Sequence, residues 1–306
     1  MTVCYTAVMD LLAAVKERTL LLDGAMGSEL ICRGFRPGGP PEEWNAGRPD
    51  EIAAIHAAYY AAGSDIVQTN TFGGSRHKLS AYGAGGRVAE LNEAAARLAI
   101  AVRDRDYPGR FVAGDIGPTG TFVAPMGDAD PDELRDGFAE QAAALVAGGV
   151  DLIHIETMFD LVEARLAVEG ARSAAPDLPL MVSLAYKPSP RGFRTMMGVD
   201  PQTAADALLA AGATMVGCNC EITAADMGEL VEELREASGR PVVAQPNAGA
   251  PRLEDGATVY DETAEQFAGL VAGFPGHGAG IVGGCCGTTP AFIAALAAKL
   301  GRSPVA

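Results

Sequence analysis

Residues Gly280–Gly287 have the sequence GIVGGCCG, a short apolar run that ends in glycines and two adjacent cysteines. Seven apolar runs of strand length along the chain end in a polar or otherwise unusual cluster of this kind. The clusters are Asp23–Gly27, Gln68–Phe72, Gly114–Pro118, Glu156–Thr157, Gly217–Cys220, Pro246–Gly249 and Gly283–Cys286. Runs that are apolar almost throughout are typical of parallel strands buried on both faces. The pattern therefore predicts a parallel sheet with functional residues at the strand ends.

The alternation of strands and helices predicts a (β/α)₈ TIM barrel. The expected strands are Leu20–Asp23, Asp65–Phe72, Phe111–Ile116, Asp151–Glu156, Leu180–Tyr186, Thr214–Cys220, Val242–Pro246 and Gly280–Gly283. Helical stretches lie between them, at Pro49–Ala62, Val88–Asp104, Asp130–Gly148, Leu161–Ala174, Pro201–Ala211, Met227–Ser238 and Glu262–Gly273. We expect a single barrel domain over residues 1–306, with an open doubly wound sheet as the alternative. In a barrel all strand C-termini lie on one face, and that face carries the chemistry.

Three cysteines fall at expected strand ends on this face. Cys220 ends the sixth strand, and Cys285 and Cys286 end the eighth, two strands away around the mouth. Consecutive residues have Cα atoms only about 3.8 Å apart, too close for an ordinary disulfide. Three thiolates that leave a fourth position open are typical of a catalytic zinc site. The sequence thus predicts Zn²⁺ bound by these cysteines and chemistry on a thiol, with a redox-active vicinal dithiol as the alternative.

Composition narrows the range of functions. The net charge is −16, from 23 basic and 39 acidic residues, which argues against a nucleic-acid or anionic-membrane surface. No apolar stretch approaches the roughly 18 residues of a membrane span, and no basic segment precedes an apolar one at the N-terminus. Six cysteines, two of them adjacent, fit a reducing compartment better than a disulfide scaffold. We therefore expect a cytoplasmic enzyme.

At these residues the chain resembles the homocysteine S-methyltransferase family. The resemblance covers almost the whole chain, through the segments Leu22–Gly27, Thr69–Phe72, Ile155–Thr157 and Ile281–Pro290. It is most specific in the Gly-x-Asn-Cys motif that ends at Cys220 and in the Gly-Gly-Cys-Cys-Gly motif. The resemblance implies a zinc-bearing barrel in which the same three cysteines are the zinc ligands. It also implies methyl transfer to the thiol of L-homocysteine, which forms methionine.

The resemblance extends to substrate-binding residues. Glu156 would bind the amino group of homocysteine, and Asp23 and Gly24 would help to hold the amino acid. Three further polar residues are expected to face the same mouth, as substrate contacts or as their support: Asn70, Asp115 and Asn247. His154 precedes Glu156 by two residues, so we expect it on the same side of the strand, as an interior histidine with hydrogen-bond partners. Cys218 is expected to be a small core residue.

The expected methyl donor is a methylated corrinoid such as methylcobalamin. Within the family, the motifs of the seventh and eighth strands most resemble the homocysteine-binding module of cobalamin-dependent methionine synthase. Gly73 stands where betaine-using enzymes carry an aromatic residue of the donor site. No cobalamin-binding module is expected within the 306 residues, so a separate protein would present the corrinoid. S-methylmethionine or betaine is the alternative donor, because Trp44 could line a cation site; otherwise Trp44 packs the first loop against the barrel.

Overall fold

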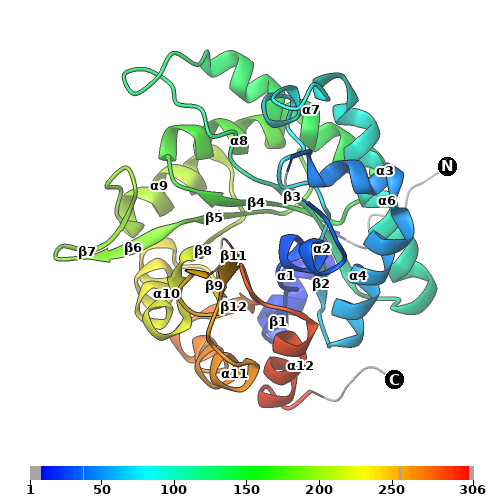
Figure 1. The fold of residues 1–306 in the computed structure, drawn as a ribbon. Coiled ribbons are helices and arrows are strands. Elements are labelled where there is room, and N and C mark those ends of the chain that lie inside the picture. The colour runs from blue at the N-terminus through cyan, green and yellow to red at the C-terminus, as the bar shows by residue number, and fades with distance from the viewer. Residues whose placement is uncertain (1–7, 37, 255–256, 303–306) are drawn as a thin grey trace.

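The chain forms a closed barrel of parallel strands (Figure 1). The computed structural model describes residues 8–36, 38–254 and 257–302. The strands of the sheet are β1 (Leu20–Leu21), β2 (Ile66–Gln68), β3 (Phe111–Ile116), β4 (Leu152–Met158), β5 (Leu180–Leu184), β8 (Met215–Thr223), β9 (Val242–Asn247) and β12 (Ala279–Val282). Their order is β1-β12-β9-β8-β5-β4-β3-β2, and a parallel bridge between Leu22 and Ile66 joins the two ends. The predicted barrel is confirmed, and the open doubly wound sheet is wrong.

Helices cover the outside of the barrel and confirm the predicted stretches. The predicted ones are α4 (Pro49–Ala61), α6 (Val88–Asp106), α7 (Pro131–Gly148), α8 (Leu161–Ala174), α9 (Pro201–Ala211), α10 (Ala224–Ser238) and α11 (Ala264–Val271). Helix α12 (Pro290–Lys299), after the last barrel strand, was not predicted. Aspartates fix the starts of α7, α8 and α9: the carboxylates of Asp130, Asp160 and Asp200 each accept a backbone N–H of the first turn. None of the helices in the described ranges is long and apolar enough to cross a membrane.

Several short elements were not predicted. They are the helices α1 (Val8–Glu17), α2 (Met26–Cys32), α3 (Trp44–Gly47) and α5 (Arg76–Ser80), and the antiparallel hairpins β6 (Tyr186–Ser189) with β7 (Gly192–Thr195) and β10 (Arg252–Glu254) with β11 (Ala257–Val259). The predicted strand Leu180–Tyr186 is too long, because β5 ends at Leu184 and Tyr186 begins β6. Both hairpins follow the C-terminal ends of barrel strands, so they lie on the predicted functional face.

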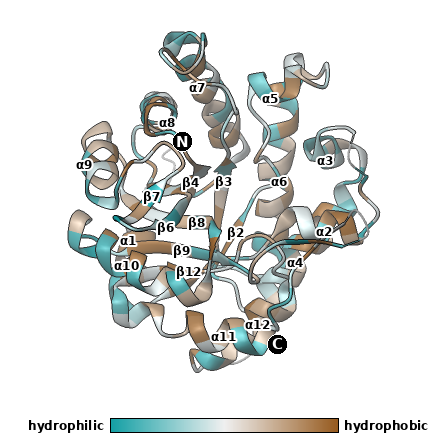
Figure 2. Cartoon of the chain, turned by 60° about the vertical axis from the view of Figure 1, so that its left-hand side comes forward, coloured by the Kyte–Doolittle hydropathy of each residue, from teal (hydrophilic) through white to brown (hydrophobic). Residues whose placement is uncertain are grey.

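Two hydrophobic layers hold the barrel together. Successive strand residues point to opposite faces, so Leu20 and Leu22 join the cluster inside the barrel, whereas Leu21 joins the larger cluster beneath the helices. In Figure 2 hydrophobic colour accordingly runs along the strands, and the hydrophilic colour gathers on the outer sides of the helices. Leu11 and Val15 of α1 extend the inner cluster. Helix α1 therefore closes the barrel at the end opposite to the mouth.

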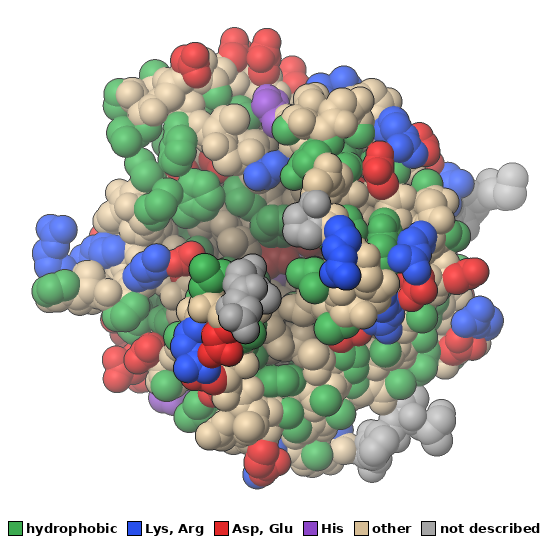
Figure 3. Space-filling model, in the orientation of Figure 1, with side chains coloured by type: hydrophobic (Ala, Val, Ile, Leu, Met, Phe, Trp, Pro, Cys, Tyr) green, Lys and Arg blue, Asp and Glu red, His purple; other side chains and the backbone are tan. Residues whose placement is uncertain are grey.

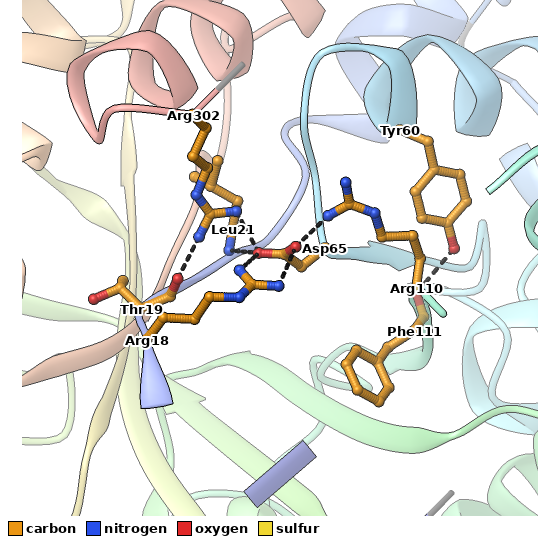
Figure 4. A network of polar contacts seen from close by, with 8 residues as sticks. All are labelled: Arg18, Thr19, Leu21, Tyr60, Asp65, Arg110, Phe111 and Arg302. Carbon is orange, nitrogen blue, oxygen red and sulfur yellow. Dashed lines mark hydrogen bonds and ion pairs between the residues drawn. The ribbon is translucent and has the colours of Figure 1, made fainter. Parts of the chain in front are cut away.

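At this closed end, one buried carboxylate connects segments beside β1 and β2, the two strands at which the barrel closes (Figure 4). Asp65, directly before β2, is 1% exposed and accepts hydrogen bonds from Arg18, Arg110, Arg302 and the backbone N–H of Leu21. Arg18 precedes β1 and Leu21 belongs to it, whereas Arg110 precedes β3 and Arg302 follows α12. Burial by itself would raise the pKa of Asp65, but the hydrogen bond from Arg18 and the other contacts outweigh it and hold the pKa below its ordinary value. The contact joins the first and last parts of the barrel.

Candidate metal centre and active site

The C-terminal ends of the strands surround a hollow. Figure 3 looks onto this face and shows acidic side chains at the floor of the hollow and hydrophobic side chains around much of its rim. Glu156 from β4 and Asp115 from β3 are among the buried acidic residues here, at 7% and 5% exposed. The face on which the sequence predicts the chemistry therefore contains a recess, and the acidic side chains in it are shielded from solvent.

Cys220, Cys285 and Cys286 come together at this mouth. Cys220 lies near the end of β8, and the other two lie in the loop after β12. The Sγ atoms of Cys220 and Cys286 are 3.9 Å apart, those of Cys285 and Cys286 are 4.0 Å apart, and all three lie within 4.8 Å of one another. Tetrahedral zinc with Zn–S bonds of about 2.3 Å requires its sulfurs to be about 3.8 Å apart. The donor set and its spacing therefore fit one zinc ion.

Contacts among the thiols favour loss of a proton. Hydrogen bonds from Cys220 and then from Cys285 hold the pKa of Cys286 at about 3. The hydrogen bond with Cys220 is the main reason why the pKa of Cys285 lies well above its ordinary value. One thiolate is thus stabilised by two thiols that keep their protons. A divalent cation in this cluster would displace those protons and take their place.

The backbone is strained beside the cluster. Thr157, Cys220 and Glu221 have φ values of 57°, 56° and 48°, in the left-handed region that residues other than glycine seldom adopt. Such positions cost on the order of 1–3 kcal/mol each and persist where surrounding contacts fix them. Asn219 supplies such contacts, because its Oδ1 accepts the N–H of Thr157 at 2.9 Å and its Nδ2 donates to Thr157 Oγ1 at 2.7 Å. The ends of β4 and β8 are thereby clamped together.

Asn219 also links the carboxylate at the floor to the thiols. Its Nδ2 donates to Oε2 of Glu156 and lies 3.8 Å from the Sγ of Cys285. The other oxygen of Glu156, Oε1, accepts from Nε2 of Gln68 at 2.8 Å. Both oxygens of the carboxylate are therefore oriented by amides from β2 and β8, each two strands away from β4 in the barrel. Substrate groups bound by Glu156 and by the thiols would be held at a fixed separation.

Three buried carboxyl groups lie at the floor, and none of them forms an ion pair with a described basic side chain. Burial is the main cause that raises the pKa of Asp23, Asp115 and Glu156 above the ordinary range, and the nearby Glu156 raises the pKa of Asp115 further. Among the described residues, Oδ1 of Asp23 and Oδ1 of Asp115 have no hydrogen-bond partner, although both atoms are buried. A bound cationic group such as an ammonium would satisfy these oxygens.

Beneath the floor, a buried polar network fixes the orientation of Gln68. The Oε1 of Gln68 accepts from Nε2 of Gln245 at 3.0 Å and lies 3.1 Å from Nδ1 of His154, which must donate because an amide oxygen can only accept. His154 Nε2 then accepts from the hydroxyl of Ser183 at 2.9 Å. Burial lowers the pKa of His154 to about 3. The prediction of an interior histidine with hydrogen-bond partners is confirmed, as is the buried position of Cys218 in the core.

The remaining predicted residues occupy different places around the mouth. The amide of Asn70 donates to the backbone oxygen of Pro41 and to Oδ1 of Asn45, so it anchors the first loop. Asn247 is 3% exposed, and its Oδ1 finds no partner within the described part of the chain. A Cβ atom on Gly24 would lie 2.6 Å from Oγ1 of Thr288, so only glycine fits there. Whether these residues contact substrate stays a prediction.

At Trp44, on the predicted donor side, Arg48 covers one face of the indole. Phe35 packs edge-on against Trp44 with ring centroids 5.8 Å apart, and the Arg48 guanidinium lies 4.0 Å from the ring centroid. The interpretation of Trp44 as a residue that packs the first loop is thus confirmed. The backbone N–H of Gly73 donates to Oε1 of Glu42 at 2.6 Å, and a Cβ on Gly73 would lie 3.0 Å from that oxygen. A buried carboxylate therefore stands beside Gly73.

Sequence reasoning missed four residues of the site. Gln68, Asn219 and Gln245 each interrupt an apolar strand with an amide, and Gln68 and Asn219 lie inside the clusters noted above. An uncharged polar side chain in such a strand was therefore an available signal. Tyr260, which follows β11 and whose ring lies against Gly287, had no comparable signal, because it lies in a loop.

Comparisons with known proteins agree with this geometry. The sequence profile of homocysteine S-methyltransferase matches residues 20–300. Methionine synthases of Mycobacterium leprae and Mycobacterium tuberculosis are 34% and 35% identical over 96% and 95% of this chain, which spans about a quarter of their length. The metallated form of the Escherichia coli homocysteine methyltransferase MmuM is 26% identical with a TM-score of 0.77, over 94% of this chain and 98% of that one. The chain therefore belongs to the homocysteine S-methyltransferase family.

Proposed function

We propose that this protein transfers a methyl group to the thiolate of L-homocysteine and forms methionine at a Zn²⁺ ion held by Cys220, Cys285 and Cys286. The observation that carries the proposal is the approach of three thiols, within 4.8 Å of one another, at the mouth of a barrel of this family. The metallated form of MmuM is a further support. We assign the activity to one catalytic domain, residues 1–306, and place it in the cytoplasm, where thiols stay reduced.

Each part of the mouth has a role in this reaction. Bound zinc would stabilise the substrate sulfur as the nucleophilic thiolate, with three cysteines leaving a coordination position for it. Glu156, with Asp115 and Asp23, would bind the ammonium group and so orient homocysteine. Asn219 would keep the carboxylate and the thiol cluster in register. A sulfur–carbon bond then forms as the bond between the methyl group and its donor breaks.

We propose a methylated corrinoid, presented by a separate protein, as the donor. The similarity to methionine synthases over nearly the whole chain supports this choice. Gly73 supports it as well, because the space beside it holds the carboxylate of Glu42 instead of an aromatic ring. The packed position of Trp44 supports it further, since Arg48 already covers one face of the indole.

Metal analysis tests the zinc site. We expect one zinc per chain in the purified protein, and loss of both zinc and methyl transfer in Cys285→Ser. Cys218→Ser is the matched control, since this thiol is buried in the core away from the cluster and should leave the zinc content unchanged. Methyl transfer by zinc-free protein would overturn the proposal. Reversible oxidation of the vicinal thiols with turnover that needs no metal would instead favour a dithiol oxidoreductase.

A panel of donors tests the corrinoid. Zinc-loaded protein and homocysteine are combined in turn with methylcobalamin, S-methylmethionine, S-adenosylmethionine and glycine betaine, and methionine is measured. We expect methionine from methylcobalamin. Rapid formation from betaine or S-methylmethionine with none from methylcobalamin would overturn the donor and leave the zinc chemistry standing.

A further inference from the structure

Gln68, at the end of β2, connects two of the carboxylates that we propose to bind the ammonium group. Its backbone N–H donates to Oδ2 of Asp23 at 2.8 Å, and its Nε2 donates to Oε1 of Glu156 at 2.8 Å. An amide donates only through its nitrogen and accepts only through its oxygen, so a reversed amide would turn an oxygen toward the carboxylate. The orientation of Glu156 therefore depends on which way the amide of Gln68 points.

A backbone carbonyl determines this direction through a second amide. The Nε2 of Gln245, on β9, lies 3.4 Å from the carbonyl oxygen of Gly284 and 3.0 Å from Oε1 of Gln68. Because a backbone carbonyl can only accept, the Gln245 atom that faces it must be the nitrogen. That nitrogen in turn requires an acceptor from Gln68, which leaves the Nε2 of Gln68 to face Glu156. Gly284 directly precedes Cys285, so this series of contacts begins in the loop of the thiol cluster.

His154 supplies the second donor to the same oxygen of Gln68. Its Nδ1 lies 3.1 Å from Gln68 Oε1, and its Nε2 accepts from the hydroxyl of Ser183 at 2.9 Å, so both ring nitrogens have partners. The ring is 0% exposed. If the amide of Gln68 were reversed, its NH₂ group would face two other donors in a place without water, and this arrangement is unfavourable. His154 thus helps to hold the amide in the direction that suits Glu156.

We propose that His154 is a positioning residue for homocysteine recognition, which holds the Gln68 amide so that the nitrogen of Gln68 orients the Glu156 carboxylate toward the ammonium group. The inference rests on the proposed function, because it assumes that Glu156 binds this group. Both His154 and Glu156 belong to β4, two residues apart on the same side of the strand. His154 would act through Gln68, without contact to the substrate.

Substitutions of His154 test this role. His154→Phe keeps an aromatic ring and removes the donor, His154→Asn keeps a donor near the place of Nδ1, and His56→Phe is the matched control at a second histidine with 0% exposure. Dissociation constants of L-homocysteine and of 2-mercaptoethanol are measured by calorimetry on zinc-loaded protein without a methyl donor. We expect His154→Phe to bind homocysteine about 3–10-fold more weakly, as for the loss of one hydrogen bond, and to bind 2-mercaptoethanol as the native protein does. His154→Asn should recover part of the affinity, and the control should match the native protein.

The outcomes distinguish this inference from the proposed function. Native homocysteine affinity in His154→Phe would overturn the positioning role, and so would an equal weakening of both thiols, because a merely structural histidine would affect both alike. Failure of the native protein to bind homocysteine would overturn the proposed function itself. Gln245→Met gives a second measurement if His154→Phe does not fold, since it removes the other donor to Gln68 Oε1. It should weaken homocysteine binding in the same range, and native affinity in this variant would also contradict the inference.

Discussion

Buried aspartates at the two ends of the barrel differ in their partners and in the direction of their pKa shifts. At the closed end, Asp65 accepts hydrogen bonds from three arginines and one backbone N–H, and its pKa lies below the ordinary value. At the mouth, Oδ1 of Asp115 has no partner among the described residues, and burial, together with the nearby Glu156, holds the pKa of Asp115 well above the ordinary value. Asp65 is 1% exposed and Asp115 is 5% exposed, so the difference lies in their partners.

This contrast indicates that the closed end contributes to the stability of the fold and that the mouth serves ligand binding. At the closed end, the charge of Asp65 is compensated by arginines of the same chain, which is what a buried structural carboxylate requires. The mouth concentrates unmatched carboxyl oxygens, strained backbone at Cys220 and Glu221, and thiols that share protons. Such groups cost folding free energy unless a ligand satisfies them. The comparison therefore predicts that substitutions at the closed end change stability, and that those at the mouth change binding.

The largest effect is expected from Asp65→Ala. Three arginines would lose their common carboxylate, and removal of one partner from a buried ionic contact costs about 3–5 kcal/mol. Arg18 is half exposed and can be resolvated, so we expect about 3 kcal/mol less free energy of unfolding, measured in urea. The folded fraction should keep its homocysteine KM.

The surface aspartate Asp106, paired with Arg105, is the matched control for this change, and Asp106→Ala should leave the unfolding midpoint where it was. A change in KM with intact stability in Asp65→Ala would contradict the separation of the two ends.

An intermediate effect is expected from Glu156→Gln at the mouth. The amide keeps the shape of the side chain and removes the charge that would meet the ammonium group, a contact worth about 1.5–3 kcal/mol. The KM for homocysteine should rise about 10–100-fold. The unfolding free energy should fall by only about 1 kcal/mol, because the new NH2 group faces the amide donor of Gln68 or Asn219 and one hydrogen bond is lost. Turnover of 2-mercaptoethanol, a thiol without the amino acid head, is the reference. An equal loss with both thiols would remove Glu156 from substrate recognition.

The smallest effect is expected at His56, a buried residue of α4 that belongs to neither end. Within the described residues neither of its ring nitrogens has a partner, and burial lowers its pKa to about 4 from 6.5. As the pH falls, His56 takes up a proton in the unfolded chain at a higher pH than in the folded protein. The free energy of unfolding is therefore highest above pH 6.5 and decreases as the pH falls toward 4.

Replacing His56 by leucine should reduce this acid sensitivity. Between pH 6.5 and 5.5 the native protein should lose about 1 kcal/mol more than His56→Leu, measured as unfolding free energy at each pH. His154, with its pKa of about 3, remains in both proteins and contributes equally to each. Parallel pH profiles for the two would show that His56 is not held neutral by burial.

Much of the fold could be read from local patterns. Strand β3 and helices α8 and α9 begin and end where the apolar runs and caps predicted. Because parallel strands end on one face of a barrel, Cys220 and the Cys285–Cys286 pair could be placed together across 64 intervening residues. The hairpins β6–β7 and β10–β11 escaped prediction, because short polar strands outside the core carry no apolar run.

The sequence by itself determined the barrel, the family and the three thiols, because hydrophobic periodicity and strand-end motifs are local patterns that can be recognised in short stretches of the chain. Only the tertiary structure decided which side chains meet: the amide of Asn219 between Glu156 and Cys285, the ring of Tyr260 on Gly287, and the three arginines on Asp65. The physical reason is that such pairs depend on register and side-chain direction across elements distant in sequence. The sequence shows an aspartate at both ends of the barrel, and only the neighbouring side chains decide whether it stabilises the fold, as Asp65 does, or is available to a ligand, as Asp115 is.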